Sequence, residues 1–308
     1  MKCRNMKHLA ILFAFVMMGG NAMAQGCADA GFCSVGAMQH GKQKTDTLHN
    51  TIGFSTAVAS GEKLSWVISP QLEIKTFIDQ RSYLEVKLPF QVVTGNLGTN
   101  VGIGDLIATY THRVSTKKTD KQLYYTIGMR FGLGNGDDAI NAKPLPMAYQ
   151  TSLGTTDVIL GLSTNIGKYI TLAAGIQQPV LQYNRNRYHT TADRDSIETV
   201  YFSSRYLQRA GDALLRVEAK KDWKHSGIHG GPLVLYHLAN DKSILANGDK
   251  IELQNSAGFT VNVNLGYYYS TEKWVFDFTI AAPVYARENR PDGLTRNAIV
   301  IPRFTFKL

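Results

Sequence analysis

Long apolar runs are missing from most of this 308-residue chain. After residue 24, no stretch approaches the roughly 18 consecutive apolar residues that a membrane-spanning helix needs. Amphipathic helical repeats are scarce too, whereas 28 glycines and 15 tyrosines suit short strands and tight turns. The sequence therefore excludes a helical membrane protein and favours an all-β chain.

The single long apolar run lies at the N-terminus. Residues 9–18 follow a basic segment that holds Lys2, Arg4 and Lys7, and residues 22–24 have the small-x-small pattern of a cleavage site. This run is too short to cross a bilayer as a helix. We therefore expect residues 1–24 to be a signal peptide for export.

Cysteine is rare, with three in the chain, and Cys3 belongs to the expected signal peptide. Because exported chains meet an oxidising compartment, Cys27 and Cys33 predict a small disulfide loop. A metal site would need more ligands nearby, and His40 alone is close in sequence. A lipoprotein would need Cys27 as its first mature residue, but residues 24–26 lack the usual aliphatic residue.

Charge of one sign does not dominate the chain. The formal net charge of +9 includes Lys2, Arg4 and Lys7, so removing residues 1–24, which hold no acidic residue, leaves +6. This excess is spread along the chain rather than clustered. Nucleic acid is therefore not an expected partner.

Residues 49–308 are dominated by apolar and polar residues that alternate with a period of two. Residues 25–48 lack this pattern and predict an irregular N-terminal segment. The hairpin in residues 153–180 illustrates the alternation: Leu160, Leu162 and Ile176 share one face, opposite Ser163 and Gln177. Twelve such segments are expected: 52–59, 66–77, 83–94, 103–115, 121–134, 157–163, 170–177, 211–223, 230–239, 259–270, 274–285 and 297–308.

Short and long connections alternate between these segments. The short ones are 79–82, 116–120, 165–168, 224–229 and 271–273, and the long ones are 95–102, 135–156, 181–210, 240–258 and 286–296. Residues 60–65 are the one brief connection among the long set. Short turns at one end and long loops at the other are typical of outer-membrane barrels.

The alternative to a membrane barrel is a secreted β-sandwich, which would bury the same apolar faces in a core. A sandwich has no reason to segregate loop length, and closure removes the sheet edges that lipid cannot satisfy. We therefore predict a transmembrane antiparallel up-and-down β-barrel of about twelve strands, with periplasmic termini, in the outer membrane of a Gram-negative bacterium. Its partners would include outer-membrane lipid.

The faces opposite the apolar rows would line the interior of such a barrel. The lumen-lining candidates are Glu85, Lys87, Asp105, Arg113, Arg130, Asp157, Arg216, Glu218, Lys220, Asp277, Arg303 and Lys307. Charges inside a small barrel either pair across it, since an unpaired buried charge is costly, or define a polar path for a solute. Both alternatives stay open at this point.

Sites for metals, cofactors and catalysis are not evident. His225 and His229 fall on a predicted short turn with nothing to orient them, so no metal site is expected. The glycine-rich segments do not open a helix, as a phosphate site of that type requires, and no cofactor is expected. His112, His189 and His237 are scattered, and no serine stands at a diagnostic motif, which disfavours an enzyme.

Several short segments resemble a known family. They are Gly102-Ile103-Gly104-Asp105-Leu106, the segment 154–161 after a long loop, and the proline-bearing strand at residues 86–89. In these the chain resembles outer-membrane barrels related to long-chain fatty-acid and aromatic-hydrocarbon transporters, including those linked to meta-pathway phenol degradation. The better-known members have fourteen strands and an N-terminal hatch, and residues 25–48 are a short segment for such a hatch.

The C-terminal residues 303–308 alternate aromatic and polar side chains and resemble the signal that the barrel-assembly machinery recognises, although Leu308 replaces the usual phenylalanine. We predict a passive transporter or channel for a small solute, which the family resemblance would make hydrophobic. The alternatives are a structural or surface-interaction barrel with a closed interior and, less favoured, an outer-membrane hydrolase.

Overall fold

The structure is a computed structural model that describes residues 49–61, 64–115, 122–189, 201–245, 247–293 and 296–308. One antiparallel sheet forms the wall. Its strands are β1 (Thr51–Gly61), β2 (Trp66–Phe77), β3 (Ser82–Gly95), β4 (Gly98–Ile103), β5 (Leu106–Ser115), β6 (Gln122–Phe131), β9 (Thr155–Ile166), β10 (Ile170–Gln182), β11 (Asp212–Asp222), β12 (Ser226–His237), β15 (Gly258–Ser270), β16 (Trp274–Tyr285) and β17 (Arg296–Lys307). The predicted signal peptide, the segment 25–48 and the Cys27–Cys33 pair lie outside these residues.

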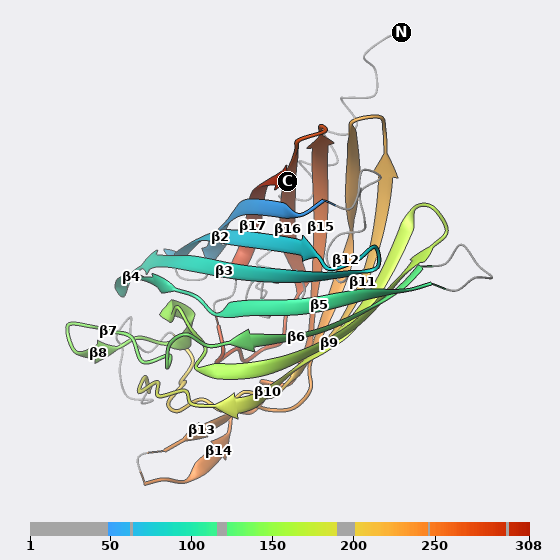
Figure 1. Ribbon diagram of the computed structural model, residues 1–308. Helices are drawn as coiled ribbons and strands as arrows, with labels where there is room; N and C mark the ends of the chain where they lie inside the picture. Colours follow the sequence, from blue (N-terminus) through green and yellow to red (C-terminus); the bar gives the residue numbers. More distant parts are fainter. Residues whose placement is uncertain (1–48, 62–63, 116–121, 190–200, 246, 294–295) are drawn as a thin grey trace.

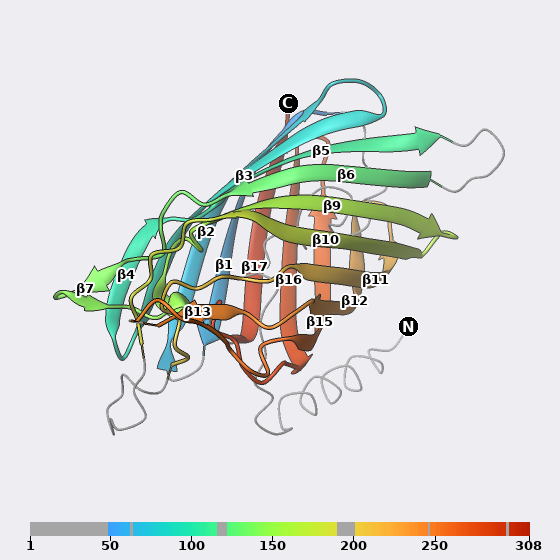
Figure 2. The same ribbon diagram turned by 90° about the horizontal axis from the view of Figure 1, so that it is seen from below.

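The sheet closes on itself, because β1 pairs with β2 on one side and with β17 on the other. Figures 1 and 2 show the strands curving around a common axis. β4 and β5 cross the wall as one strand that is interrupted at Gly104 and Asp105, and both pair with β3. The barrel therefore has the twelve antiparallel strands that the sequence predicted.

The prediction of a long loop at residues 95–102 is wrong. β3 and β4 instead continue as a tight hairpin, with Gly95 opposite Gly98 and Thr94 opposite Thr99. Gly98 has a φ of 111°, which only glycine adopts readily, and this lets the chain reverse within two residues. The wall is therefore extended on the long-loop side at β3 and β4.

The hairpin of β9 and β10 has the predicted orientation. Leu160, Leu162 and Ile176 are exposed on the outer face, whereas Asp157 and Gln177 are fully buried on the inner face. The strands are joined at Gly167–Tyr169, where Gly167 has a φ of 66°. The inner row is not merely small and polar, because Ile159 is also fully buried there.

A second correction concerns β12. The sequence predicted a turn at residues 224–229 and a strand from 230, but β12 begins at Ser226 and pairs Gly227 with Asp222 of β11. The two glycines at 230 and 231 interrupt the apolar alternation, which hid the start of this strand. His229 is therefore a strand residue and points inward, where it is buried.

The long connections carry small elements of their own. Between β6 and β9 lie β7 (Ala139–Ile140), β8 (Lys143–Pro144) and a 3-10 turn (Met147–Tyr149), and between β12 and β15 lie β13 (Lys242–Ile244) and β14 (Lys250–Glu252). Leu145 and Tyr149 pack against Val67 of β2 and Val93 of β3, whose side chains face inward. This connection therefore lies against the inside of the barrel mouth.

No helix within the described residues is long and apolar enough to cross a membrane.

The outer face of the barrel carries an apolar belt of exposed aliphatic and aromatic side chains. On β3 and β15, for example, Leu84, Val86, Leu88, Val263, Leu265 and Tyr267 are exposed. A soluble protein rarely exposes so continuous a surface, which is suited to lipid.

We expect an arginine on this belt to destabilise the barrel according to its depth. Leu160→Arg, near the middle of β9, should reduce the free energy of unfolding in phospholipid vesicles by about 2–4 kcal/mol. Ile166→Arg, at the end of β9, is the matched control and should cost about 0–1 kcal/mol, since the guanidinium reaches the headgroups. Urea titrations of both variants measure the difference, and equal losses would contradict the membrane placement.

Candidate functional site

Lys87 is the centre of one charged group on the inner wall. Its ammonium lies 3.4 Å from Glu73 on the neighbouring strand and 3.4 Å from Glu85 on its own strand. The guanidinium of Arg303 approaches Glu73 at 3.2 Å, and Ser55 donates a hydrogen bond to the same carboxylate at 2.8 Å. The structure thus brings together Glu85, Lys87 and Arg303 and adds Glu73, which the sequence analysis missed although its strand alternates.

His229 forms a second group, with Asp277 of β16 and Glu218 of β11. Its Nε2 lies 2.9 Å from Asp277, and its Nδ1 lies 3.9 Å from Glu218. Gly266 of β15 leaves room for this imidazole, because a Cβ there would overlap the His229 ring. The sequence analysis places the start of β12 too late, and His229 is therefore predicted as a turn residue.

A third group ties the wall to a long connection. Arg130 of β6 contacts Asp105 at 2.8 Å, and the same Asp105 oxygen accepts a hydrogen bond from the Leu153 backbone N–H at 3.3 Å. Both charged side chains were predicted inner residues. Their pairing follows from the register, since β4 and β5 are interrupted at Asp105 beside the end of β6.

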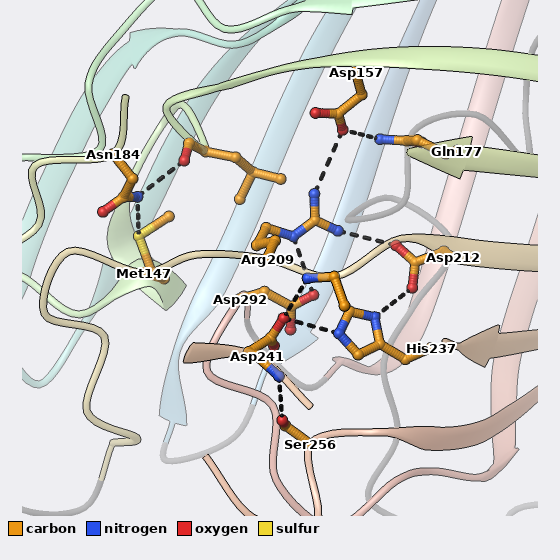
Figure 3. A network of polar contacts seen from close by, with 12 residues as sticks. Met147, Asp157, Gln177, Asn184, Arg209, Asp212, His237, Asp241, Ser256 and Asp292 are labelled. Carbon is orange, nitrogen blue, oxygen red and sulfur yellow. Dashed lines mark hydrogen bonds and ion pairs between the residues drawn. The ribbon is translucent and has the colours of Figure 1, made fainter. Parts of the chain in front are cut away.

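The largest group, here called the mouth network, surrounds Arg209 (Figure 3). Its guanidinium contacts three carboxylates: Asp212 at 3.0 Å, Asp157 at 3.5 Å and Asp292 at 3.5 Å. Asp157 also accepts a hydrogen bond from Gln177. The arginine side chain is 2% exposed, so these are buried ion pairs.

His237 extends the mouth network to another connection. Its Nδ1 lies 2.7 Å from Asp212 and its Nε2 lies 2.8 Å from Asp241. Asp241 in turn accepts a hydrogen bond from the Ala210 backbone N–H at 2.9 Å. The network therefore joins the ends of β9, β10, β11 and β12 to the connections that hold Arg209, Asp241 and Asp292.

In the connections, neighbouring groups of opposite charge stabilise each other's ionised forms. Burial alone would lower the pKa of Arg209, but Asp212, Asp292 and Asp157 outweigh it and raise that pKa above its ordinary value. Burial alone would likewise raise the pKa of Asp292, yet Arg287 and Arg209 hold it well below its ordinary value. Both groups therefore stay ionised across the physiological pH range.

Apolar packing accompanies the mouth network. Tyr149 is fully buried, and its hydroxyl lies 3.2 Å from the hydroxyl of Tyr201 in the connection between β10 and β11. Met147, Leu153 and Leu207 form a further small cluster between these two connections. The described parts of the two connections, here called the mouth segments (residues 132–154, 183–189 and 201–211), thus pack on each other and on the inner wall.

The inner wall also has an apolar inner patch, formed by β5, β9, β10, β11 and β12. Its members are Ile107, Ile159, Ala173, Leu214, Leu233 and Leu235. Asn262 of β15, directly opposite Leu233, is 3% exposed, and neither of its amide atoms has a hydrogen-bond partner among the described residues. The patch therefore lies beside an amide group whose hydrogen-bonding capacity is unused.

Of the other predicted inner residues, Arg216 lies beside the His229 group, and Arg113, Lys220 and Lys307 lie near the short-turn end. Arg216 is buried on β11, next to Glu218 in the inward row. Lys220 pairs with Asp222 at 3.7 Å, Arg113 donates to the Gln80 carbonyl at 3.2 Å, and Lys307 donates to the Thr271 carbonyl at 2.8 Å. Whether any of these side chains guides a solute remains a prediction.

Metal ligands and catalytic groups are the remaining candidates. Within the described part of the chain, no group of three or more His, Cys, Asp or Glu side chains could hold a metal. Ser82 lies 2.8 Å from His112 Nδ1, but the nearby Asp79 carboxylate contacts the serine hydroxyl at 3.1 Å. Activation of a serine nucleophile requires a carboxylate that orients the histidine, and Asp79 contacts the serine instead.

A closed twelve-stranded barrel with an apolar belt outside and buried charges inside is an integral outer-membrane protein. The bacterial outer membrane is accordingly its location.

No family model and no curated protein matches the chain. Among solved structures, it is similar to an outer-membrane channel from Pseudomonas putida F1, with a TM-score of 0.61 and 16% identity, over 87% of this chain and 100% of that one. More distant barrels are the KdgM porin (TM-score 0.43, 8% identity, 84% and 99% covered) and the NalP translocator domain from Neisseria meningitidis (0.43, 9%, 85% and 90%). The first of these similarities establishes the fold.

Proposed function

We propose that this protein is a passive channel for a small, mainly apolar solute. The observation that carries the proposal is the apolar inner patch, which turns aliphatic side chains such as Ile159 and Leu233 inward from the wall of a membrane barrel. The patch and Asn262 are buried, so a solute that enters the interior and displaces their packing would meet both apolar side chains and an unpaired amide.

Two further considerations support this proposal. The chain resembles fatty-acid and aromatic-hydrocarbon transporters in short segments, and the Pseudomonas putida F1 protein with a similar fold is described as a channel. The charged groups around Lys87 and His229 are paired within the wall, so they can hold it rigid without providing a free charge for an ionic solute.

Purified protein in planar bilayers and in proteoliposomes tests the function. We expect discrete conductance steps, and faster entry of neutral apolar solutes than of charged analogues of the same size. Leu233→Asp should slow apolar entry about tenfold, since a contact worth about 1.4 kcal/mol is lost in the patch. Entry of charged analogues through the same variant is the control and should not fall.

Absence of both conductance and solute entry would contradict the channel and favour the alternative, a structural or surface-interaction barrel. The mouth segments are the observation that favours this alternative, because they pack across the inner wall. Hydrolysis of lipid by the purified protein would instead favour an enzyme.

We also propose that the barrel-assembly machinery recognises β17. Phe304 and Phe306 are exposed on the outer face of this strand and alternate with Arg303, Thr305 and Lys307. Replacing both phenylalanines with threonine should reduce the amount of barrel in the outer membrane. Refolding of the same variant into detergent provides the control, because it requires no machinery.

A further inference from the structure

Among the residues that the structure describes, the exposed charges are distributed unequally between the two ends of the barrel. At the short-turn end, the exposed basic residues are Arg81, Lys168, Lys221, Lys224 and Lys273. The exposed acidic residues in the described turns there are Asp79 and Glu272. At the long-loop end the two signs are nearly balanced, with basic side chains at 143, 185, 187, 242 and 250 and acidic ones at 137, 249, 252 and 288.

The five basic side chains at the short-turn end, here called the basic rim, lie in the turns or, for Lys221, at the end of β11. Within the described ranges, none of the five makes an ion pair, whereas the half-buried Lys220 pairs with Asp222. The two exposed acidic groups of the described turns, Asp79 and Glu272, offset only two of these five positive charges. The basic rim therefore presents an uncompensated positive charge.

The basic rim borders the apolar belt directly. Lys221 and Lys224 flank Trp223, which is 47% exposed, and the Lys168 ammonium lies 5.7 Å from the Tyr169 ring centroid. Lys273 immediately precedes Trp274, whose ring packs on Tyr269. Exposed tryptophan and tyrosine lie at the level of lipid headgroups, so the adjacent ammonium groups lie at the level of the phosphates.

We propose that the basic rim binds phospholipids with a net negative headgroup, such as phosphatidylglycerol, in the periplasmic leaflet. The short turns are the periplasmic ones in barrels of this type. The charge asymmetry argues for lipid rather than an acidic protein, because the cations are spread over four separate turns around the circumference instead of forming one patch. This proposal does not depend on the channel function.

Lipid binding to the purified full chain tests the proposal. Native mass spectrometry in a neutral detergent, with added phosphatidylglycerol or phosphatidylcholine, measures how tightly each lipid is retained. We expect at least tenfold tighter retention of phosphatidylglycerol, since each cation near an anionic surface contributes about fivefold. Raising the salt from about 0.1 M to 1 M should abolish most of this preference, because the screening length falls from about 10 Å to 3 Å.

Two matched variants locate the binding. The rim variant carries Arg81→Gln, Lys168→Gln, Lys221→Gln, Lys224→Gln and Lys273→Gln, and the loop variant carries Lys143→Gln, Arg185→Gln, Arg187→Gln, Lys242→Gln and Lys250→Gln. Both lose five positive charges. We expect the rim variant to lose the preference for phosphatidylglycerol at least tenfold and the loop variant to keep it. Heat-modifiable migration in electrophoresis shows whether each variant is folded.

If the rim variant does not fold, the salt titration of the unaltered protein and the double variant Lys168→Gln, Lys224→Gln still decide the matter. Equal retention of the two lipids by the unaltered protein would overturn the proposal. So would equal loss in the rim and loop variants. An acidic protein partner would give the first of these results.

Discussion

Replacing Arg209 with methionine is expected to destabilise the barrel mouth by about 3–5 kcal/mol. The guanidinium contacts Asp157, Asp212 and Asp292, and its side chain is almost fully buried. Methionine fills a similar volume but leaves three carboxylates without their cation. Breaking a buried ion pair from one side is costly for this reason, even where the intact pair adds little.

Urea unfolding of the refolded protein measures this effect, with Arg185→Met as the control. Arg185 is an exposed arginine of the same mouth segment, and its replacement should change the free energy by less than about 0.5 kcal/mol. Arg209→Lys should recover only part of the loss, because one ammonium cannot contact three carboxylates on separate elements. Equal stability of the Arg209→Met and Arg185→Met variants would refute the network.

Replacing Tyr149 with alanine is expected to cost about 3–5 kcal/mol and to enlarge the single-channel conductance. Tyr149 is fully buried, contacts Tyr201 across the mouth segments, and packs on the inward side chains of β2 and β3. Removing the ring releases this connection from the wall. The consequence is a wider opening at the long-loop end.

Planar-bilayer recordings and urea titration provide the two measurements for this residue. Tyr149→Phe removes the hydroxyl and keeps the ring, so it should cost about 1 kcal/mol and leave the conductance close to its original value. A larger conductance in the phenylalanine variant, or an unchanged one in the alanine variant, would show that the mouth segments do not restrict passage.

The wall could be predicted from the sequence because lipid imposes a simple pattern on it. A strand that faces hydrocarbon on one side must alternate, so Leu160, Leu162 and Ile176 were placed outward correctly. Where alternation is interrupted, the prediction failed. Adjacent glycines at 230 and 231 hid the start of β12, and Gly98 concealed the β3–β4 hairpin inside an expected loop.

The polar groups were predicted only in part, for a different physical reason. Asp157, Arg216 and Asp277 lie in clearly alternating strands, so their inward orientation follows from the pattern. Their partners depend on long-range geometry: Arg209 and Asp292 come from connections without periodicity. Arg209 contacts both Asp157 and Asp292 only because these connections come together at the barrel mouth. Local sequence carries no signal for such a contact.

Closure of the wall has a consequence for folding kinetics. The other neighbouring strands of the wall lie near each other in the chain, but β1 and β17 bring Thr51 opposite Lys307. The entropy lost in closing a loop grows with its length, so this seam is the slowest contact to form. Until it forms, two strand edges are exposed and can pair with other chains. Aggregation during refolding should therefore depend on protein concentration until the seam is closed, and should stop once it has formed.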